Sequence, residues 1–186
     1  HGLWFMEATA VWSEDELYNG INDLYRYMPA WFSNPDRPID DQSSHMYGTF
    51  ILFQYIDEHF GGPETIKACW ENSRYLSSPT QDVTYEAVDN ALSIYNSSFE
   101  DAYLKMRIAN RILSSSAGIY SYNESEAYKE VVNIPPEELL IFNSGQIETE
   151  QDQDLNLYES NYYTVVTEVP LRIQLTEISG NLSLSS

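Results

Sequence analysis

The sequence predicts an α+β protein: residues 1–133 are mainly helical, and residues 134–186 form a small, incomplete antiparallel β region. As far as residue 113, apolar side chains recur three and four residues apart, the spacing of helices with one buried face. After Pro135-Pro136, short runs at 162–166 and 171–175 have the composition or the alternation of strands. Because so few strands cannot close a sandwich, we expect the β region to be the start of a larger β-sandwich-like domain.

The boundaries of the expected helices follow from capping and turn residues. Gly61-Gly62 ends one helix and Pro63 suits the first turn of the next. Ser98, three residues before Asp101, has the position of an N-cap. Residues 18–41 contain several turn dipeptides and are expected to be a packed loop. The expected helices span residues 3–17, 44–60, 64–73, 82–95 and 98–113.

The charge balance narrows the classes of partner. The chain has 29 Asp and Glu residues against 9 Lys and Arg, a net charge of -20. Such a negative field repels phosphate backbones, so nucleic acid is not an expected partner. No apolar run reaches about 18 residues, so the sequence predicts no membrane span. With Cys69 as the one cysteine, the chain offers neither an internal disulfide nor a thiolate zinc site.

Glu7 is the first candidate functional residue. Trp4, Glu7, Ala8 and Val11 lie three and four residues apart, so the carboxylate is expected within an apolar helix face. A buried carboxylate is costly unless it is paired or bound to a metal. The alternatives are an ion pair with an arginine, or exposure near a frayed helix end. Glu14 follows seven residues later, close to the same face.

The motif around Glu7 resembles a known family. From Trp4 to Glu14 the chain reads Trp-x-x-Glu-Ala-x-Ala-x-Trp-x-Glu. This is similar to the segment that follows the HExxH helix in secreted, gluzincin-like zinc metallopeptidases. The resemblance covers residues 2–113 and, more weakly, 155–175. It implies the C-terminal subdomain of a catalytic domain followed by the start of a β-domain, with Glu7 as the third zinc ligand and Glu14 as an acid supporting the ligands.

A second motif, His45-Met46-Tyr47-Gly48, lies at the start of an expected helix. In gluzincin aminopeptidases a Tyr-x-x-Gly opening supplies a hydroxyl to the reaction's tetrahedral intermediate. Here Tyr47 adjoins the glycine and His45 stands three residues before it. The resemblance therefore implies that either Tyr47, through its O–H, or His45, through an N–H, stabilises the oxyanion.

The three histidines of the chain cannot supply the zinc ligands of an HExxH helix. None of His1, His45 and His59 forms the i, i+4 pair of an HExxH helix. A catalytic zinc site needs three protein ligands, so zinc is expected only if an HExxH segment lies upstream of His1. The sequence then predicts a fragment of a zinc-dependent metalloendopeptidase, inactive alone. The alternative is a non-catalytic structural or binding module that retains the scaffold.

The remaining expectations concern partners, calcium and location. The expected partner is a peptide or protein substrate, or the missing upstream part of the same protein, in a secreted or extracellular setting. Oxygen-rich loops can bind Ca²⁺, although neither of the two acidic clusters in this chain has EF-hand spacing. These candidate calcium loops contain Asp36, Asp40 and Asp41, and Glu148, Glu150, Asp152 and Asp154.

Overall fold

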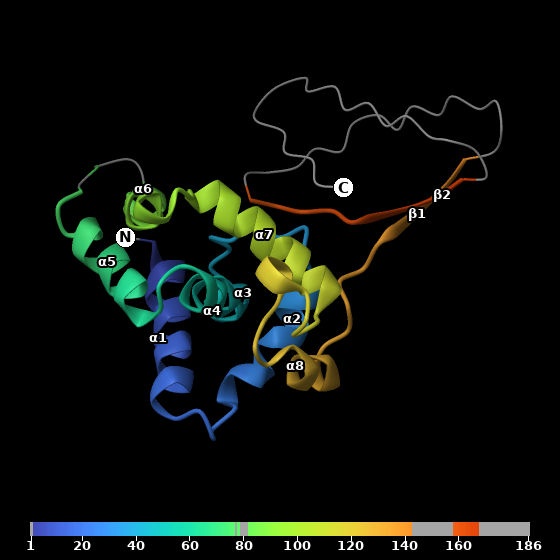
Figure 1. Cartoon of the computed structure of the whole chain (residues 1–186), viewed down its shortest axis with the longest axis horizontal. Coiled ribbons are helices and arrows are strands. Elements are labelled where there is room, and N and C mark those ends of the chain that lie inside the picture. Colours follow the sequence, from blue (N-terminus) through green and yellow to red (C-terminus); the bar gives the residue numbers. More distant parts are fainter. Residues whose placement is uncertain (1, 77, 79–81, 143–157, 168–186) are drawn as a thin grey trace. The chain divides into compact units, whose positions relative to one another are not determined.

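The computed structural model describes residues 2–76, 78, 82–142 and 158–167 (Figure 1). Its residues group into two compact units: His1–Pro136 with Asp154–Tyr162, and Glu137–Gln153 with Tyr163–Ser186. All described helices belong to the first unit, and the described strands belong to the second. The predicted α+β class is therefore confirmed.

The helical unit consists of short and medium helices. The α-helices are α1 (Leu3–Leu17), α2 (Met28–Ser33), α3 (His45–Gly48), α4 (Phe50–His59), α5 (Pro63–Ser73), α6 (Thr84–Leu92), α7 (Phe99–Ile112) and α8 (Ser125–Val131). Single 3-10 turns are η1 (Asp23–Arg26), η2 (Ser93–Tyr95) and η3 (Gly118–Tyr120). No helix in the described part of the chain is both long and apolar enough to cross a membrane.

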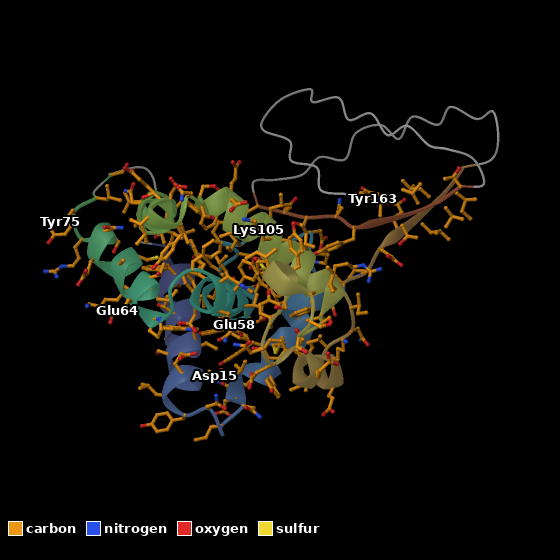
Figure 2. The ribbon with its side chains drawn as sticks, in the orientation of Figure 1. Asp15, Glu58, Glu64, Tyr75, Lys105 and Tyr163 are labelled. Atoms are coloured by element: carbon orange, nitrogen blue, oxygen red, sulfur yellow. The ribbon has the colours of Figure 1, made fainter. Side chains whose placement is uncertain are left out.

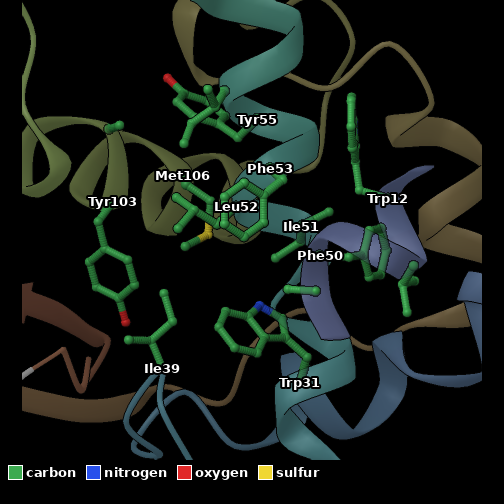
Figure 3. Packing of buried hydrophobic residues seen from close by; sticks show 14 of the residues in the cluster. Trp12, Trp31, Ile39, Phe50, Ile51, Leu52, Phe53, Tyr55, Tyr103 and Met106 are labelled. Carbon is green, nitrogen blue, oxygen red and sulfur yellow. The ribbon is translucent and has the colours of Figure 1, made fainter. Parts of the chain in front are cut away.

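The aromatic residues account for much of the core. Helix α4 is buried along most of its length and packs against α1, α5 and α7, while α1 also packs against α3. Figure 3 shows side chains of α2, α4 and α7 meeting in this core, among them Trp31, Phe53 and Met106. Burying rings of this size is a major source of stability, and it fixes the helices that carry the candidate site.

Asp82 anchors the start of α1 from the far side of the sequence. Its carboxylate accepts hydrogen bonds from the Gly2 amide at 2.9 Å and from the Trp4 indole N–H at 3.0 Å. Burial alone would raise the pKa of Asp82, but these bonds and those from Thr84 outweigh burial and lower it. The carboxylate thus accepts from the Gly2 amide, which has no acceptor within α1, and it holds the start of α1 beside the start of α6.

The strands differ from the predicted pairing. β1 (Glu138–Phe142) and β2 (Tyr163–Thr167) pair in parallel, with Glu138 opposite Tyr163, so the predicted antiparallel arrangement is wrong. Residues 143–162 lie between the strands, more than the dozen or so that a parallel crossover requires. The predicted strand at 171–175 lies outside the described residues.

The helix predictions hold best where one apolar face is continuous. The prediction for α1 matches its bounds, and Ser98 caps α7 by accepting the Asp101 amide at 3.1 Å. The predicted helix 44–60 is two helices, α3 and α4, separated at Thr49. Helix α2 lies inside the predicted loop, where turn dipeptides on both sides conceal the helical spacing of Met28, Trp31 and Phe32.

Candidate functional site

Glu7 lies at the edge of the buried face of α1 rather than in its middle. Phe5 and Trp12 are buried together with Trp4 and Ala8, which moves the centre of the buried face away from Glu7. The Glu7 side chain is half-buried, and its neighbour Met6 is 49 % exposed. None of the ion pairs found between described residues includes Glu7. The carboxylate therefore borders solvent without a basic partner among the described side chains.

Glu14 is exposed, and the buried acid at this end of α1 is the next residue, Asp15. The Asp15 side chain is 5 % exposed, and its Oδ1 has no hydrogen-bond partner. Burial, followed by the charges of Glu124 and Glu16, raises the pKa of Asp15 to about 6. Sequence reasoning missed Asp15, although it stands four residues after Val11 and three after Trp12, the spacing of the buried stripe.

Tyr47 presents its ring at the surface of α3. The ring is half-buried and stacks on Tyr27, with centroids 4.9 Å apart and planes 20° apart. Tyr27 is held in turn by Arg26, whose guanidinium lies 4.6 Å from the Tyr27 ring and donates to the Tyr27 hydroxyl. No hydrogen bond joins the Tyr47 hydroxyl to another described residue. Stacking thus orients the ring, and no described residue engages its O–H.

His45 faces the core instead. It is 2 % exposed and stacks on Trp31 with ring centroids 4.3 Å apart. Burial, followed by the positive charge of Arg107, lowers the pKa of His45 to about 4, so the imidazole is neutral near pH 7. Its Nε2 is buried and has no partner among the described residues. This places the imidazole less favourably than Tyr47 for contact with a substrate.

Arg107 of α7 is a buried cation that sequence reasoning did not single out. It is 4 % exposed and its guanidinium lies 4.6 Å from the Trp31 ring. Its Nε donates to the Tyr103 hydroxyl at 2.8 Å, whereas Nη2 has no partner. Arg107 lies at helical spacing with Tyr103, Met106 and Asn110, which are all buried on α7. This spacing could have indicated that Arg107 is buried. Arg107 packs on the Trp31 ring, and Trp31 in turn stacks on His45.

Gly48 is required by close packing of α3 on α2. A Cβ at this position would lie 2.7 Å from the Trp31 Cβ and 3.3 Å from the Tyr27 carbonyl oxygen. Both neighbours belong to the packing that orients Tyr47 and His45. The glycine in the Tyr-Gly motif therefore has a packing reason in this chain.

The substitution Gly48→Ala is expected to lower the free energy of unfolding by roughly 1–3 kcal/mol, because backbone and Trp31 must shift to admit the methyl group. Urea denaturation followed by tryptophan fluorescence measures the change. Gly20→Ala is the matched control, since nothing lies within 4 Å of a Cβ at that turn. Equal stability of the Gly48→Ala and Gly20→Ala proteins would contradict the packing argument.

The fold brings the candidate helices together but does not complete a metal centre. Helix α1, with Glu7, packs against α3, with Tyr47 and His45. Within the described ranges, no group of three His, Cys, Asp or Glu residues is placed to hold a metal ion. Glu7 suits a zinc ligand in being half-buried and in having no basic partner in the described part of the chain, but the other two ligands would have to come from elsewhere.

The candidate calcium loops give no convergent oxygen site among the described residues. Asp41 is engaged locally: Oδ1 accepts the Ser43 amide at 2.7 Å, and Oδ2 lies 3.8 Å from the Arg37 guanidinium. Hydrogen bonds from Ser43, stronger than the opposing effect of burial, lower the pKa of Asp41. The second loop, containing Glu148, Glu150, Asp152 and Asp154, lies outside the described residues.

Comparison of the chain with protein-family models, with curated proteins and with solved structures finds no match.

Proposed function

We propose that the chain is part of a zinc-dependent metalloendopeptidase, to which it contributes Glu7 as one zinc ligand and Tyr47 as a hydrogen-bond donor to the substrate. The observation that carries the proposal is the packing of α1 on α3. Glu7, half-buried and without a basic partner among the described residues, and Tyr47, half-buried and stacked on Tyr27, thus lie on helices that are in contact. The remaining ligands and the general base would come from a segment upstream of His1.

Each side chain has a separate role in this reaction. A bound zinc ion would supply an activated water and polarise the scissile carbonyl. The Glu7 carboxylate would hold the metal, which requires that no basic side chain compete for it. The Tyr47 O–H would donate to the oxygen of that carbonyl as negative charge develops, because its ring is fixed by Tyr27. His45 is the weaker candidate for this role, because its Nε2 is enclosed by protein.

Hydrolysis of a peptide library tests the proposal. The protein is expressed with whatever residues its gene encodes upstream of His1, and cleavage is followed by mass spectrometry. We expect cleavage that a chelator abolishes and zinc restores, and that Glu7→Gln reduces by at least about 100-fold because a neutral amide is a poor zinc ligand. The control is Glu86→Gln, an exposed carboxylate on α6. Cleavage that survives Glu7→Gln, or no chelator-sensitive cleavage, would refute the proposal.

One observation favours the alternative of a non-catalytic binding module. A hollow of about 590 Å³ lies between α1 and α5 and is lined largely by apolar groups, including Met6, Ile66 and Trp70. Exposed apolar surface of this kind suits contact with another protein segment. Under this alternative, substitution of Ala10, which also lines the hollow, by Trp would weaken partner binding while Glu7→Gln would have no effect.

A further inference from the structure

A small acidic recess lies where α1 ends and the chain turns into η1. Its volume is about 240 Å³. Three of its side chains carry carboxylates, and the other four are apolar or aromatic. The lining consists of Val11, Glu14, Asp15, Tyr18, Ile21, Asp23 and Leu24. The Ile21 amide donates to the Tyr18 carbonyl at 2.7 Å, so the turn that forms the rim is hydrogen-bonded.

Asp15 is the buried acid of this recess, and no basic side chain among the described residues pairs with it. Its Oδ1 is enclosed and unpaired, and the charges that act on it most are those of Glu124 and Glu16. The charge of Asp15 acts in turn on Tyr128 of α8 and Tyr25 of η1, and burial followed by nearby carboxylates raises the pKa of both phenols. Tyr128 is itself fully buried with an unpaired hydroxyl. Figure 2 labels Asp15 together with Glu58, another carboxylate that acts on Tyr128. Arg26 already acts electrostatically on two of the recess carboxylates, Glu14 and Asp23, but not on Asp15. A cation beside Asp15 would relieve the repulsion on that carboxylate.

We propose that the recess binds the cationic side chain of a lysine or arginine residue in a peptide. Such side chains carry an apolar stem and a charged head, which match the apolar wall and the three carboxylates. The volume is below the roughly 300–1,000 Å³ of small-molecule pockets and suits one side chain. A metal ion fits less well, because no three carboxylates in the described part of the chain are placed to hold one.

The recess lies on the same side of α1 as Glu7. Glu7, Val11, Glu14 and Tyr18 follow one another at steps of four, three and four residues, which keeps them on one helix face. Seven residues of helix place Glu14 about 10 Å beyond Glu7 along the axis. An extended peptide covers that distance in roughly three residues. If the proposed peptidase function holds, on which this register rests, the recess selects substrates with a basic residue about three positions from the scissile bond.

Peptide binding tests the recess without requiring zinc or catalysis. Capped peptides of the form Gly-Gly-X-Gly-Gly, with arginine, lysine or norleucine at X, are titrated into the protein in the presence of a chelator and followed by NMR. We expect the arginine and lysine peptides to bind at least about tenfold more tightly than the norleucine peptide, and added salt to weaken them. Asp15→Asn should reduce binding of the arginine peptide about tenfold, whereas Glu86→Gln should leave it unchanged. Thermal unfolding of each variant shows that the fold is intact.

Two results would overturn the proposal. Equal affinity for the arginine and norleucine peptides would show that the carboxylates do not select a cation. Tight Ca²⁺ binding that Asp15→Asn abolishes, in titrations without chelator, would identify a metal site instead. Because the peptide titrations contain no zinc, they can fail while cleavage still depends on Glu7, and they can succeed where no cleavage occurs. Failure of the recess and failure of the peptidase proposal are therefore distinguishable.

Discussion

Tyr47→Phe is expected to lower kcat for peptide cleavage by about 10²–10³-fold in the protein that carries the upstream segment. The phenol would donate a hydrogen bond to an oxygen that becomes fully charged only in the transition state, and loss of one such donor typically costs this much. KM should change little, because the contact is weak in the ground state. Steady-state kinetics on a cleaved peptide separates the two constants.

The stacking partner provides the matched control for Tyr47. Tyr27→Phe keeps the ring that packs on Tyr47 and removes only a hydroxyl that accepts from Arg26. This variant should keep kcat within a few-fold of the unchanged protein, with equal zinc content in both. If Tyr47→Phe has the same kcat as Tyr27→Phe, Tyr47 is not the electrophile. The same comparison with His45→Gln then shows whether the imidazole has that role.

Asp15→Asn is expected to stabilise the protein by roughly 1–3 kcal/mol near neutral pH. The pKa of Asp15 is about 6 in the folded chain against an ordinary 3.8, so folding favours the protonated acid. Stability from this group is complete below about pH 3.8 and is lost as the pH rises through 6. A neutral amide removes that loss, so the gain should be largest above pH 6 and disappear toward pH 4. Urea denaturation across this pH range measures it.

At each pH, the difference in unfolding free energy between Asp15→Asn and the unchanged protein reports Asp15 alone, because other titrating groups contribute equally to both. His45 acts in the other direction: its pKa of about 4, below the ordinary 6.5, makes stability fall as the pH drops through that window. Both proteins contain His45, so its contribution cancels in the difference. Glu86→Gln serves as the exposed control. A difference between Asp15→Asn and the unchanged protein that is independent of pH would contradict a raised pKa for the buried Asp15.

The sequence predicted helices whose signals are local. The bounds of α1 and the Ser98 cap depend on spacing and hydrogen bonds within one turn, which residue order contains directly. The parallel pairing of β1 and β2 was missed because it joins residues far apart in the chain, and no local pattern specifies the partner of a strand.

The candidate site was predictable in its residue types but not in its burial. Spacing placed Glu7 on an apolar face, yet the balance of Phe5, Trp12 and Thr9 shifts that face and leaves Glu7 at its edge. Spacing could equally have identified Asp15. However, an acid two residues before Leu17, the last residue of α1, is usually solvated at the helix end. Arg107 and Trp31 come from distant helices, and their contact at 4.6 Å follows only from tertiary packing.

Zinc stoichiometry in the Glu7→Gln protein shows whether Glu7 binds the metal. Protein expressed with its upstream residues is dialysed against metal-free buffer, and zinc is counted by elemental analysis beside the unchanged protein and Glu86→Gln. We expect one tightly held zinc per chain in the unchanged and Glu86→Gln proteins and a substoichiometric amount in Glu7→Gln. Full zinc occupancy in Glu7→Gln, or none in the unchanged protein, would contradict a role for Glu7 as a zinc ligand.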